Sequence, residues 1–217
     1  MAPKLYYCRG SPAVRAVLIT AKALEIELEH HEMDFFKQEH LSPAYLKLNP
    51  QHTVPTLDDN GTALWDSHAI DAYLVRKYGK DDSLYPKDFV KRAVVDQRLH
   101  FDTGVTYPIL IAVDMAYLKK EITEVPVHYV EKIKEAYQFL EKFLQGHLWV
   151  AGDKVTIADF SLVPTTTSLE YHVKIDPKVY PNIAGWLKRA QALPYFSSDH
   201  EQLQCFINYL DSVRGIK

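Results

Sequence analysis

Lys4-Leu5-Tyr6-Tyr7-Cys8-Arg9-Gly10-Ser11-Pro12 is the stretch that decides the fold, because it joins a predicted strand to a predicted helix. The β-prone run Lys4–Cys8 stops at the turn-forming pair Arg9-Gly10. Ser11 is a favoured N-cap, and Pro12 suits the first helical position because an N–H there would lack a helical partner in any case. Apolar residues then recur at helical spacing, at Val14, Val17, Leu18 and Ala21.

Strand patterns continue on the C-terminal side of this helix. Residues 26–29 alternate Ile and Leu with Glu, which is the period-two pattern of a half-buried strand. Two further β-prone runs, Val54–Leu57 and Thr62–Trp65, are joined by Asp58-Asp59-Asn60-Gly61, and the Asn-Gly pair favours a hairpin. The order predicted from these patterns is β-α-β, a turn-rich middle, and a hairpin.

One more helix and a polar segment close this first part of the chain. Ser67 is a candidate N-cap for a helix that runs toward Tyr78, and Gly79 is placed to end it. The residues after Gly79 are polar and include a proline, which indicates a linker. We therefore predict an α/β domain of βαβ-ββα order at residues 1–80 and a linker at 81–87.

Residues 88–217 are predicted to form an all-helical domain. Two apolar stripes keep helical spacing, one at Ile133, Tyr137, Leu140 and Leu144 and one at Leu203, Phe206, Ile207 and Leu210. Thr156-Ile157-Ala158-Asp159 has the form of a capping box, with aspartate in the role more often given to glutamate. One helix start is therefore well marked near residue 156.

Composition narrows the class of protein. The chain has 47% hydrophobic residues and a net charge of −3, so it should fold around a core and has no electrostatic reason to bind nucleic acid or an anionic membrane. Cys8 and Cys205 cannot form a disulfide framework or a metal cluster. The first residues lack the apolar run of a signal peptide, and no apolar stretch is long enough to cross a bilayer. The expected location is the cytoplasm.

Five motifs in order give the chain a strong resemblance to the cytosolic glutathione transferases of the insect delta and epsilon classes. They are the serine turn Arg9-Gly10-Ser11-Pro12, and the segments 48–57, 66–70, 77–86 and 156–160. In the acidic-Ser-basic segment 66–70, the basic residue is His68 and not an arginine, which indicates the epsilon class. The resemblance implies a thioredoxin-like first domain, a helical bundle, a homodimer, glutathione as co-substrate and no metal or redox cofactor.

Ser11 is the expected catalytic residue by this resemblance. Glutathione carries a thiol whose pKa, like that of free cysteine, is about 8.5, so the enzyme must stabilise the thiolate. A hydroxyl at the N-terminus of a helix can donate to the sulfur, while the helix dipole also favours negative charge there. Simple N-capping is the alternative reading of Ser11. Tyr6, Tyr7 and Cys8 are rival groups, although adjacent strand residues face opposite sides and a strand cysteine is more often buried and inert.

The resemblance also implies a glutathione site with two polar ends. Val54 would pair its backbone with the cysteinyl part of glutathione if the bond to Pro55 is cis. The glycyl carboxylate would lie near two imidazoles, and the γ-glutamyl end would be held by an acidic-Ser-basic segment. The expected residues are His40, His52, Val54, Pro55, Asp66, Ser67 and His68, with Asp102 reaching the site of a neighbouring subunit.

A small hydrophobic electrophile is the expected second substrate. One face of a predicted helix carries Tyr107, Leu110, Ile111, Asp114, Met115 and Leu118. Core packing also explains such a stripe, and Asp114 departs from a wholly apolar wall. Pro108 is expected to kink this helix, because it removes the bond to Gly104. Pro12 and Phe206 are expected to complete the cleft, with core packing as the alternative role for Phe206.

The predicted activity is therefore conjugation of glutathione to electrophiles in xenobiotic or insecticide detoxification. Peroxidase and dehydrochlorinase side activities are expectations at the level of the class. Two other hypotheses remain open at this stage. One is a non-catalytic carrier of hydrophobic ligands that uses the same cleft, and the other is a transferase-like module of a translation or scaffold protein.

Overall fold

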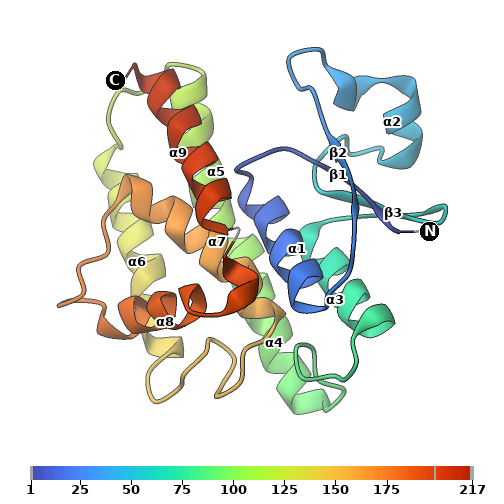
Figure 1. Ribbon diagram of the computed structural model, residues 1–217. Coiled ribbons are helices and arrows are strands. Elements are labelled where there is room, and N and C mark those ends of the chain that lie inside the picture. The colour runs from blue at the N-terminus through green and yellow to red at the C-terminus, as the bar shows by residue number, and fades with distance from the viewer. Residues whose placement is uncertain (1, 198, 216–217) are drawn as a thin grey trace.

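The computed structural model describes residues 2–197 and 199–215. Its N-terminal part is a four-stranded sheet with helices, and its second part is a bundle of helices that lies beside α1 and α3 (Figure 1). The first part contains β1 (Lys4–Tyr7), α1 (Pro12–Ala23), β2 (Glu29–Glu32), the 3-10 turn η1 (Glu39–Leu41), α2 (Pro43–Leu48), β3 (Thr56–Asp59), β4 (Thr62–Trp65) and α3 (Ser67–Tyr78).

The sheet has the order β2-β1-β3-β4, with β1 and β2 parallel and the other pairs antiparallel. This arrangement confirms the predicted βαβ-ββα order. The Asn60-Gly61 hairpin is also confirmed, because both residues have positive φ, at 54° and 89°, as a two-residue hairpin turn requires.

Two strand positions were predicted wrongly. The second strand lies at Glu29–Glu32 and not at residues 26–29, because β1 pairs Lys4 with Glu29. Ile26 and Leu28 instead pack against the small core under the sheet. The third strand begins at Thr56 and not at Val54, since Pro55 has no N–H to give to a ladder.

The cap of α3 also differs from the prediction. Asp66, not Ser67, is the N-cap, and its carboxylate accepts hydrogen bonds from the backbone N–H groups of His68 and Ala69 at 3.0 and 3.2 Å. A carboxylate at this position also complements the helix dipole. Gly79 ends α3 as predicted, with its N–H donating to the carbonyl of Val75 at 3.0 Å.

The second part of the chain is helical, as predicted. It consists of α4 (Phe89–Phe101), the π-helical segment η2 (Asp102–Thr106), α5 (Tyr107–Leu118), α6 (Val127–Phe143), α7 (Ile157–His172), α8 (Pro181–Gln191), η3 (Pro194–Phe196) and α9 (Asp199–Arg214). Pro108 lies in the first turn of α5, directly after the π-helical η2, and the kink expected there stays a prediction. Across the described residues, no helix has both the length and the apolar character needed to span a membrane. The predicted linker, residues 81–87, lies between α3 and α4 and stays a prediction.

Asp159 lies in the first turn of α7 and is fully buried. Its carboxylate accepts hydrogen bonds from the N–H of Thr156 at 2.9 Å, the N–H of Val150 at 3.0 Å and the indole of Trp186 at 2.9 Å. Burial raises the pKa of this carboxyl to about 6, although the three donors act in the opposite direction. The predicted capping box is therefore confirmed, and it also anchors α8 through Trp186.

A buried arginine joins the two parts of the chain. The side chain of Arg15 on α1 is fully buried and forms a bidentate ion pair with Asp199 at the start of α9. Its Nε and Nη2 donate to the two carboxylate oxygens at 2.7 and 2.9 Å. Its remaining N–H groups donate to the Pro164 carbonyl and to the hydroxyls of Thr167 and Ser168 on α7. One guanidinium thus links α1, α7 and α9.

Asp71 on α3 is fully buried, and neither carboxylate oxygen has a hydrogen-bond partner among the described residues. Burial raises the pKa of this carboxyl to about 7, although the nearby hydroxyl of Thr20 acts in the opposite direction. A raised pKa in the folded state means that the folded protein binds an extra proton between the ordinary pKa of 3.8 and about 7. Stability should therefore fall as the pH rises through this window.

Replacing Asp71 with Asn should stabilise the protein at pH 7 to 8 by more than about 1.4 kcal/mol, which is the equivalent of one pKa unit. The gain should shrink as the pH falls from about 7 and vanish only well below 3.8, where wild-type Asp71 is neutral in both states. Urea unfolding of both proteins at a series of pH values measures the difference. An equal difference at every pH would contradict the assignment.

Candidate functional site

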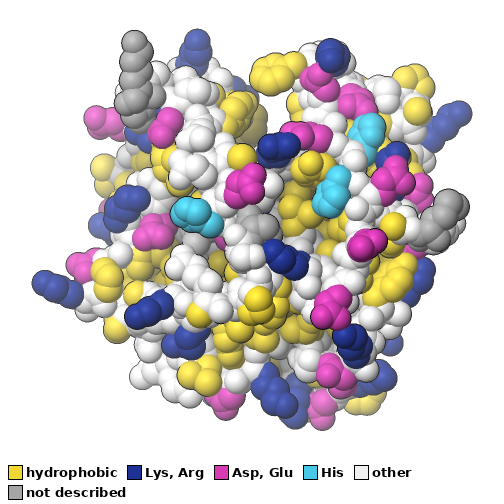
Figure 2. Space-filling model, viewed as in Figure 1, with side chains coloured by type: hydrophobic (Ala, Val, Ile, Leu, Met, Phe, Trp, Pro, Cys, Tyr) yellow, Lys and Arg dark blue, Asp and Glu magenta, His cyan; other side chains and the backbone are white. Residues whose placement is uncertain are grey.

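A pocket of about 190 Å³ lies where the two parts of the chain meet. The residues that line it come from the start of α1, the loop before β3, the start of α3, the η2–α5 junction and α7. They are Pro12, Ala13, Ala16, Gln51, Thr53, Val54, Pro55, Asp66, Ser67, His68, Asp102, Thr103, Tyr107, Ser161 and Thr165. The space-filling view shows a hollow between the two halves, with hydrophobic side chains on its walls (Figure 2). No three His, Cys, Asp or Glu side chains form a metal site in the part of the chain that the structure describes.

Ser11 is the N-cap of α1 by position, but its hydroxyl makes no capping hydrogen bond within the described chain. The hydroxyl of Ser42, the N-cap of α2, differs because it accepts from the N–H of Tyr45 at 3.3 Å. Pro12 and Ala13, the next two residues, line the pocket. Simple N-capping therefore does not explain Ser11, and its hydroxyl remains available to a ligand at the helix start.

The rival groups on β1 lie outside the pocket lining. Tyr6 packs its ring against His31 and Tyr45, while Tyr7 packs against His30 on the other side of the strand. Burial raises the pKa of the Cys8 thiol to about 11, so this cysteine stays protonated at neutral pH. Ser11 does not belong to the lining either, but it directly precedes Pro12 and Ala13, which do.

The polar end of the pocket contains a histidine–aspartate pair. His68 Nε2 and Asp102 Oδ2 are 3.1 Å apart, and the hydroxyl of Thr106 donates to the other oxygen of Asp102 at 2.5 Å. Burial acts to lower the pKa of His68, but the hydrogen bond and charge of Asp102 outweigh it and raise the pKa. Asp102 thus lies in the pocket of its own chain, and its expected contact with a neighbouring subunit stays a prediction.

The loop before β3 is held by side chains from α2 and its end. Tyr45 donates to the carbonyl of Thr53 at 2.6 Å, and Asn49 donates to the same carbonyl at 3.1 Å. The Val54-Pro55 peptide bond is cis. These contacts position the backbone of Val54 at the pocket.

The two predicted imidazoles lie close together, although neither lines the pocket. The rings of His40 and His52 are 6.1 Å apart, and His40 also packs on Phe35. His40 Nδ1 is buried and has no hydrogen-bond partner in the described chain. The neighbours of His52 in sequence, Gln51 and Thr53, do line the pocket.

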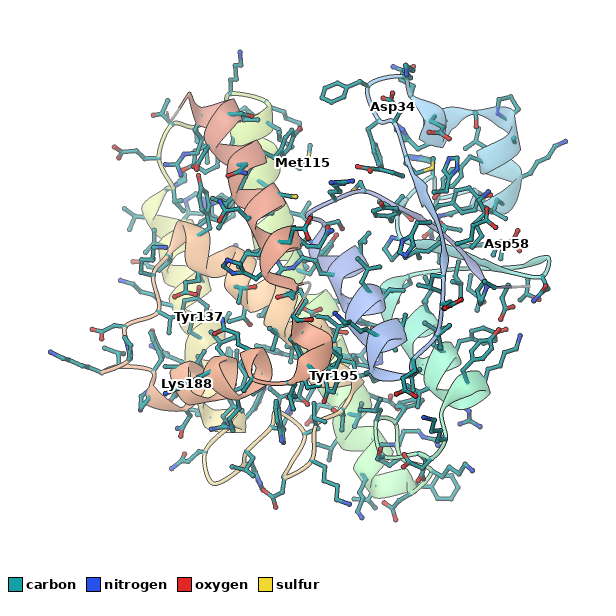
Figure 3. The ribbon with its side chains drawn as sticks, in the orientation of Figure 1. Asp34, Asp58, Met115, Tyr137, Lys188 and Tyr195 are labelled. Carbon is teal, nitrogen blue, oxygen red and sulfur yellow. The ribbon has the colours of Figure 1, made fainter. Side chains whose placement is uncertain are left out.

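The expected apolar stripe on α5 divides between core and cleft. Tyr107 lines the pocket, whereas Leu110 is fully buried in the helical core. Ile111 and Met115 are 37% and 40% exposed, and Met115 is labelled on the side of the bundle that faces Asp34 (Figure 3). Leu118 is half-buried at the end of the same helix.

Two residues expected at the cleft have other contacts. Phe206 lies in the helical core, where its ring packs against Tyr171, so core packing is its role in this structure. Asp114 is mostly buried, and its Oδ1 lies 2.7 Å from His172 Nε2 on α7. Neither residue belongs to the pocket lining.

Sequence reasoning missed several lining residues. Ala13 and Ala16 are small residues one turn apart on α1, and Ser161 and Thr165 have the same relation on α7. The hydroxyl of Thr165 donates to the Ser161 carbonyl at 3.3 Å, while the Ser161 hydroxyl is buried without a partner in the described chain. Small polar residues at helical spacing after the capping box were the signal that could have found the α7 pair.

Comparisons with known proteins give a consistent answer. The family model described as the N-terminal domain of glutathione S-transferase matches residues 5–82, and the C-terminal domain model matches residues 102–194. Glutathione S-transferase 1 of Manduca sexta is 42% identical, over 90% of this chain and 91% of the relative.

Two solved structures are also similar over nearly their whole length. An epsilon-class glutathione S-transferase from the housefly Musca domestica has a TM-score of 0.94 and 46% identity, covering 97% of this chain and 98% of the other. A glutathione transferase homologue from Drosophila mojavensis, solved with bound glutathione, has a TM-score of 0.93 and 45% identity, covering 97% of each chain.

Proposed function

Because the chain belongs to the glutathione S-transferase family, of the insect epsilon and delta type, we propose that it conjugates glutathione to hydrophobic electrophiles. The observation that carries this proposal is the uncapped hydroxyl of Ser11 at the start of α1, beside a pocket with a polar end. Detoxification in the cytoplasm by a homodimer is part of the proposal. The domain boundary at residues 81–87 is a further part, since the two family models leave residues 83–101 between them.

Ser11 would stabilise the glutathione thiolate. Its hydroxyl would donate to the sulfur, and the N-terminal end of α1 favours the negative charge. The thiol proton leaves to solvent, and the sulfur then attacks an electrophilic carbon. In a substitution, the carbon–sulfur bond forms as the bond to the leaving group breaks. In an addition to an activated double bond, the carbon–sulfur bond forms and the neighbouring carbon takes a proton from solvent. Holding both reactants in one pocket lowers the barrier by several kcal/mol more.

The rest of glutathione would lie along the two polar edges of the pocket. The γ-glutamyl end would meet Asp66, the hydroxyl and backbone N–H of Ser67, and the positive end of the α3 dipole, with His68 supporting it. The backbone of Val54 would pair with the cysteinyl part. The glycyl carboxylate would meet His52 and His40. His40 Nδ1 is buried and has no hydrogen-bond partner among residues 2–197 and 199–215.

Changing Asp102 to Asn should raise the KM for glutathione roughly tenfold, the size of one charge-assisted hydrogen bond, and lower kcat much less. Asp102 keeps His68 protonated to higher pH, so glutathione affinity should fall as the pH rises through the pKa of His68. In the variant this fall should move to lower pH. Initial rates at varied glutathione and pH measure both effects. An unchanged pH profile would show that the pair is only structural.

The function itself is tested by titrating bound glutathione and following its thiolate by ultraviolet absorbance. A thiolate with a pKa below that of free glutathione, together with conjugation of a neutral aryl halide, is the expected result. A hydrophobic-ligand carrier would bind in the cleft and show neither. Because nothing in the comparisons favours a carrier, the transferase is the stronger reading.

A further inference from the structure

Asp114 is a mostly buried carboxylate on the apolar helix α5, outside the pocket lining. Asp114 follows Ile111 by three residues and precedes Met115, both of which are partly exposed. It shares a helix face with Tyr107, which lines the pocket seven residues earlier. Seven residues rise about 10 Å along a helix. Asp114 therefore lies beyond the pocket on the line that a long second substrate would follow.

His172 holds this carboxylate in place from the protein side. Its Nε2 lies 2.7 Å from Asp114 Oδ1, and its side chain is fully buried, whereas 12% of the Asp114 side chain remains exposed. The imidazole is itself fixed between the parallel ring of Tyr117 and the edge of Tyr171. One oxygen of Asp114 is thus fixed by α7, and the exposed part of the side chain remains for a ligand.

Within the described residues, Asp114 forms no recorded ion pair with a lysine or arginine, and the nearby guanidinium of Arg214 stacks on the rings of Tyr117 and Tyr171 instead. The recorded hydrogen-bond and ion-pair partner of Asp114 in the described chain is His172. Burial raises the pKa of Asp114, and the hydrogen bond to His172 acts in the opposite direction. When ionised, the carboxylate places one negative charge at the partly exposed side of the pair. A negative charge at the edge of an apolar wall attracts a cation that brings its own apolar body.

From these contacts we propose that Asp114 is a specificity-determining residue, which selects hydrophobic electrophiles that carry a protonated amine. This inference rests on the transferase function proposed above and adds the chemical class of its second substrate. The ammonium would pair with the exposed side of the Asp114 carboxylate. The electrophilic carbon would lie near Tyr107 and Ser11, on the order of 10 Å away along α5.

The experiment compares two aryl halides of equal length, one with an aminoalkyl tail and one with a neutral alkyl tail. Wild-type enzyme should give a kcat/KM roughly tenfold or more higher for the cationic acceptor, the effect of one hydrogen-bonded charge. The preference should be greatest when the tail places the nitrogen about 10 Å from the ring. Asp114→Asn and Asp114→Leu should each collapse the ratio of the two kcat/KM values toward one.

Asp34 supplies a matched control, because it is an acidic residue at the edge of the N-terminal part, opposite Met115 (Figure 3). The Asp34→Asn variant should still prefer the cationic acceptor. If an acidic cleft merely attracted cations in general, the preference would weaken in the Asp34 variant as well as in the Asp114 variants. The inference is overturned if the wild-type enzyme does not prefer the cationic acceptor. This comparison uses wild-type protein alone, so it does not depend on whether a variant folds. If bound glutathione gives no thiolate and neither acceptor reacts, the proposed transferase function itself fails.

Discussion

Ser11→Ala should lower kcat/KM for a neutral aryl halide by roughly 10- to 100-fold, the equivalent of one hydrogen bond to a charged group. The pKa of bound glutathione should rise toward that of the free thiol, because the helix dipole remains and the hydroxyl donor does not. Ultraviolet titration of the thiolate and steady-state rates measure the two effects. The change removes a hydroxyl that makes no capping hydrogen bond to the described residues, so the stability of the fold should change little.

Ser42→Ala is the matched control, because the hydroxyl of Ser42 does cap its helix. This variant should lose about 1 kcal/mol of stability and keep the thiolate pKa. The opposite pattern, in which Ser11→Ala destabilises the fold and leaves the thiolate pKa unchanged, would make Ser11 an ordinary N-cap.

Arg15→Met should destabilise the protein by about 3 to 5 kcal/mol, the range for breaking a buried ion pair from one side. The change leaves the carboxylate of Asp199 uncompensated between α1 and α9. The hydroxyls of Thr167 and Ser168 keep partners, since they donate to the carbonyls of Val163 and Pro164 at 2.9 and 2.8 Å. Denaturant unfolding measures the loss.

The double variant Arg15→Met, Asp199→Leu should recover most of this stability, because no unpaired charge remains. Arg9→Met is the surface control, since the Arg9–Glu32 pair is about half exposed on both sides and such pairs contribute about 1 kcal/mol or less. An equally small loss from Arg15→Met would mean that the buried pair does not hold the two parts together.

Local signals explain which parts of the fold could be predicted from the sequence. The strand–turn–helix at Ser11, the hairpin at Asn60-Gly61 and the capping box at Asp159 each depend on residues a few positions apart. Their backbone preferences act without help from the rest of the chain. The position of β2 could not be read in this way, because the register with Lys4 decides it and not the alternation at residues 26–29.

Contacts between distant segments explain what could not be predicted. Arg15 and Asp199 are 184 positions apart, and Asp114 and His172 are 58 positions apart. In the sequence, Arg15 resembles a solvated residue on the polar face of a helix, and Asp114 resembles an interruption of an apolar stripe. Each becomes meaningful only when the packing of α1, α5, α7 and α9 is known. The α7 residues of the pocket lining did have a local signal, the small polar residues at helical spacing, but only the packing of α7 beside α1 shows that they face the pocket.

The turn that carries Ser11 rests directly on α9. Gly10 has a φ of 81°, and a Cβ built there would lie only 2.8 Å from the backbone nitrogen of Phe206. The N–H of Gly10 also donates to the side chain of Gln202 at 3.1 Å. The two halves are therefore not interchangeable parts. In a chimera that joins residues 1–80 to the helical half of a relative, the turn before Ser11 would pack against a different last helix. If Ser11 acts as proposed, the thiolate pKa of such a chimera should depend on which relative supplied that helix.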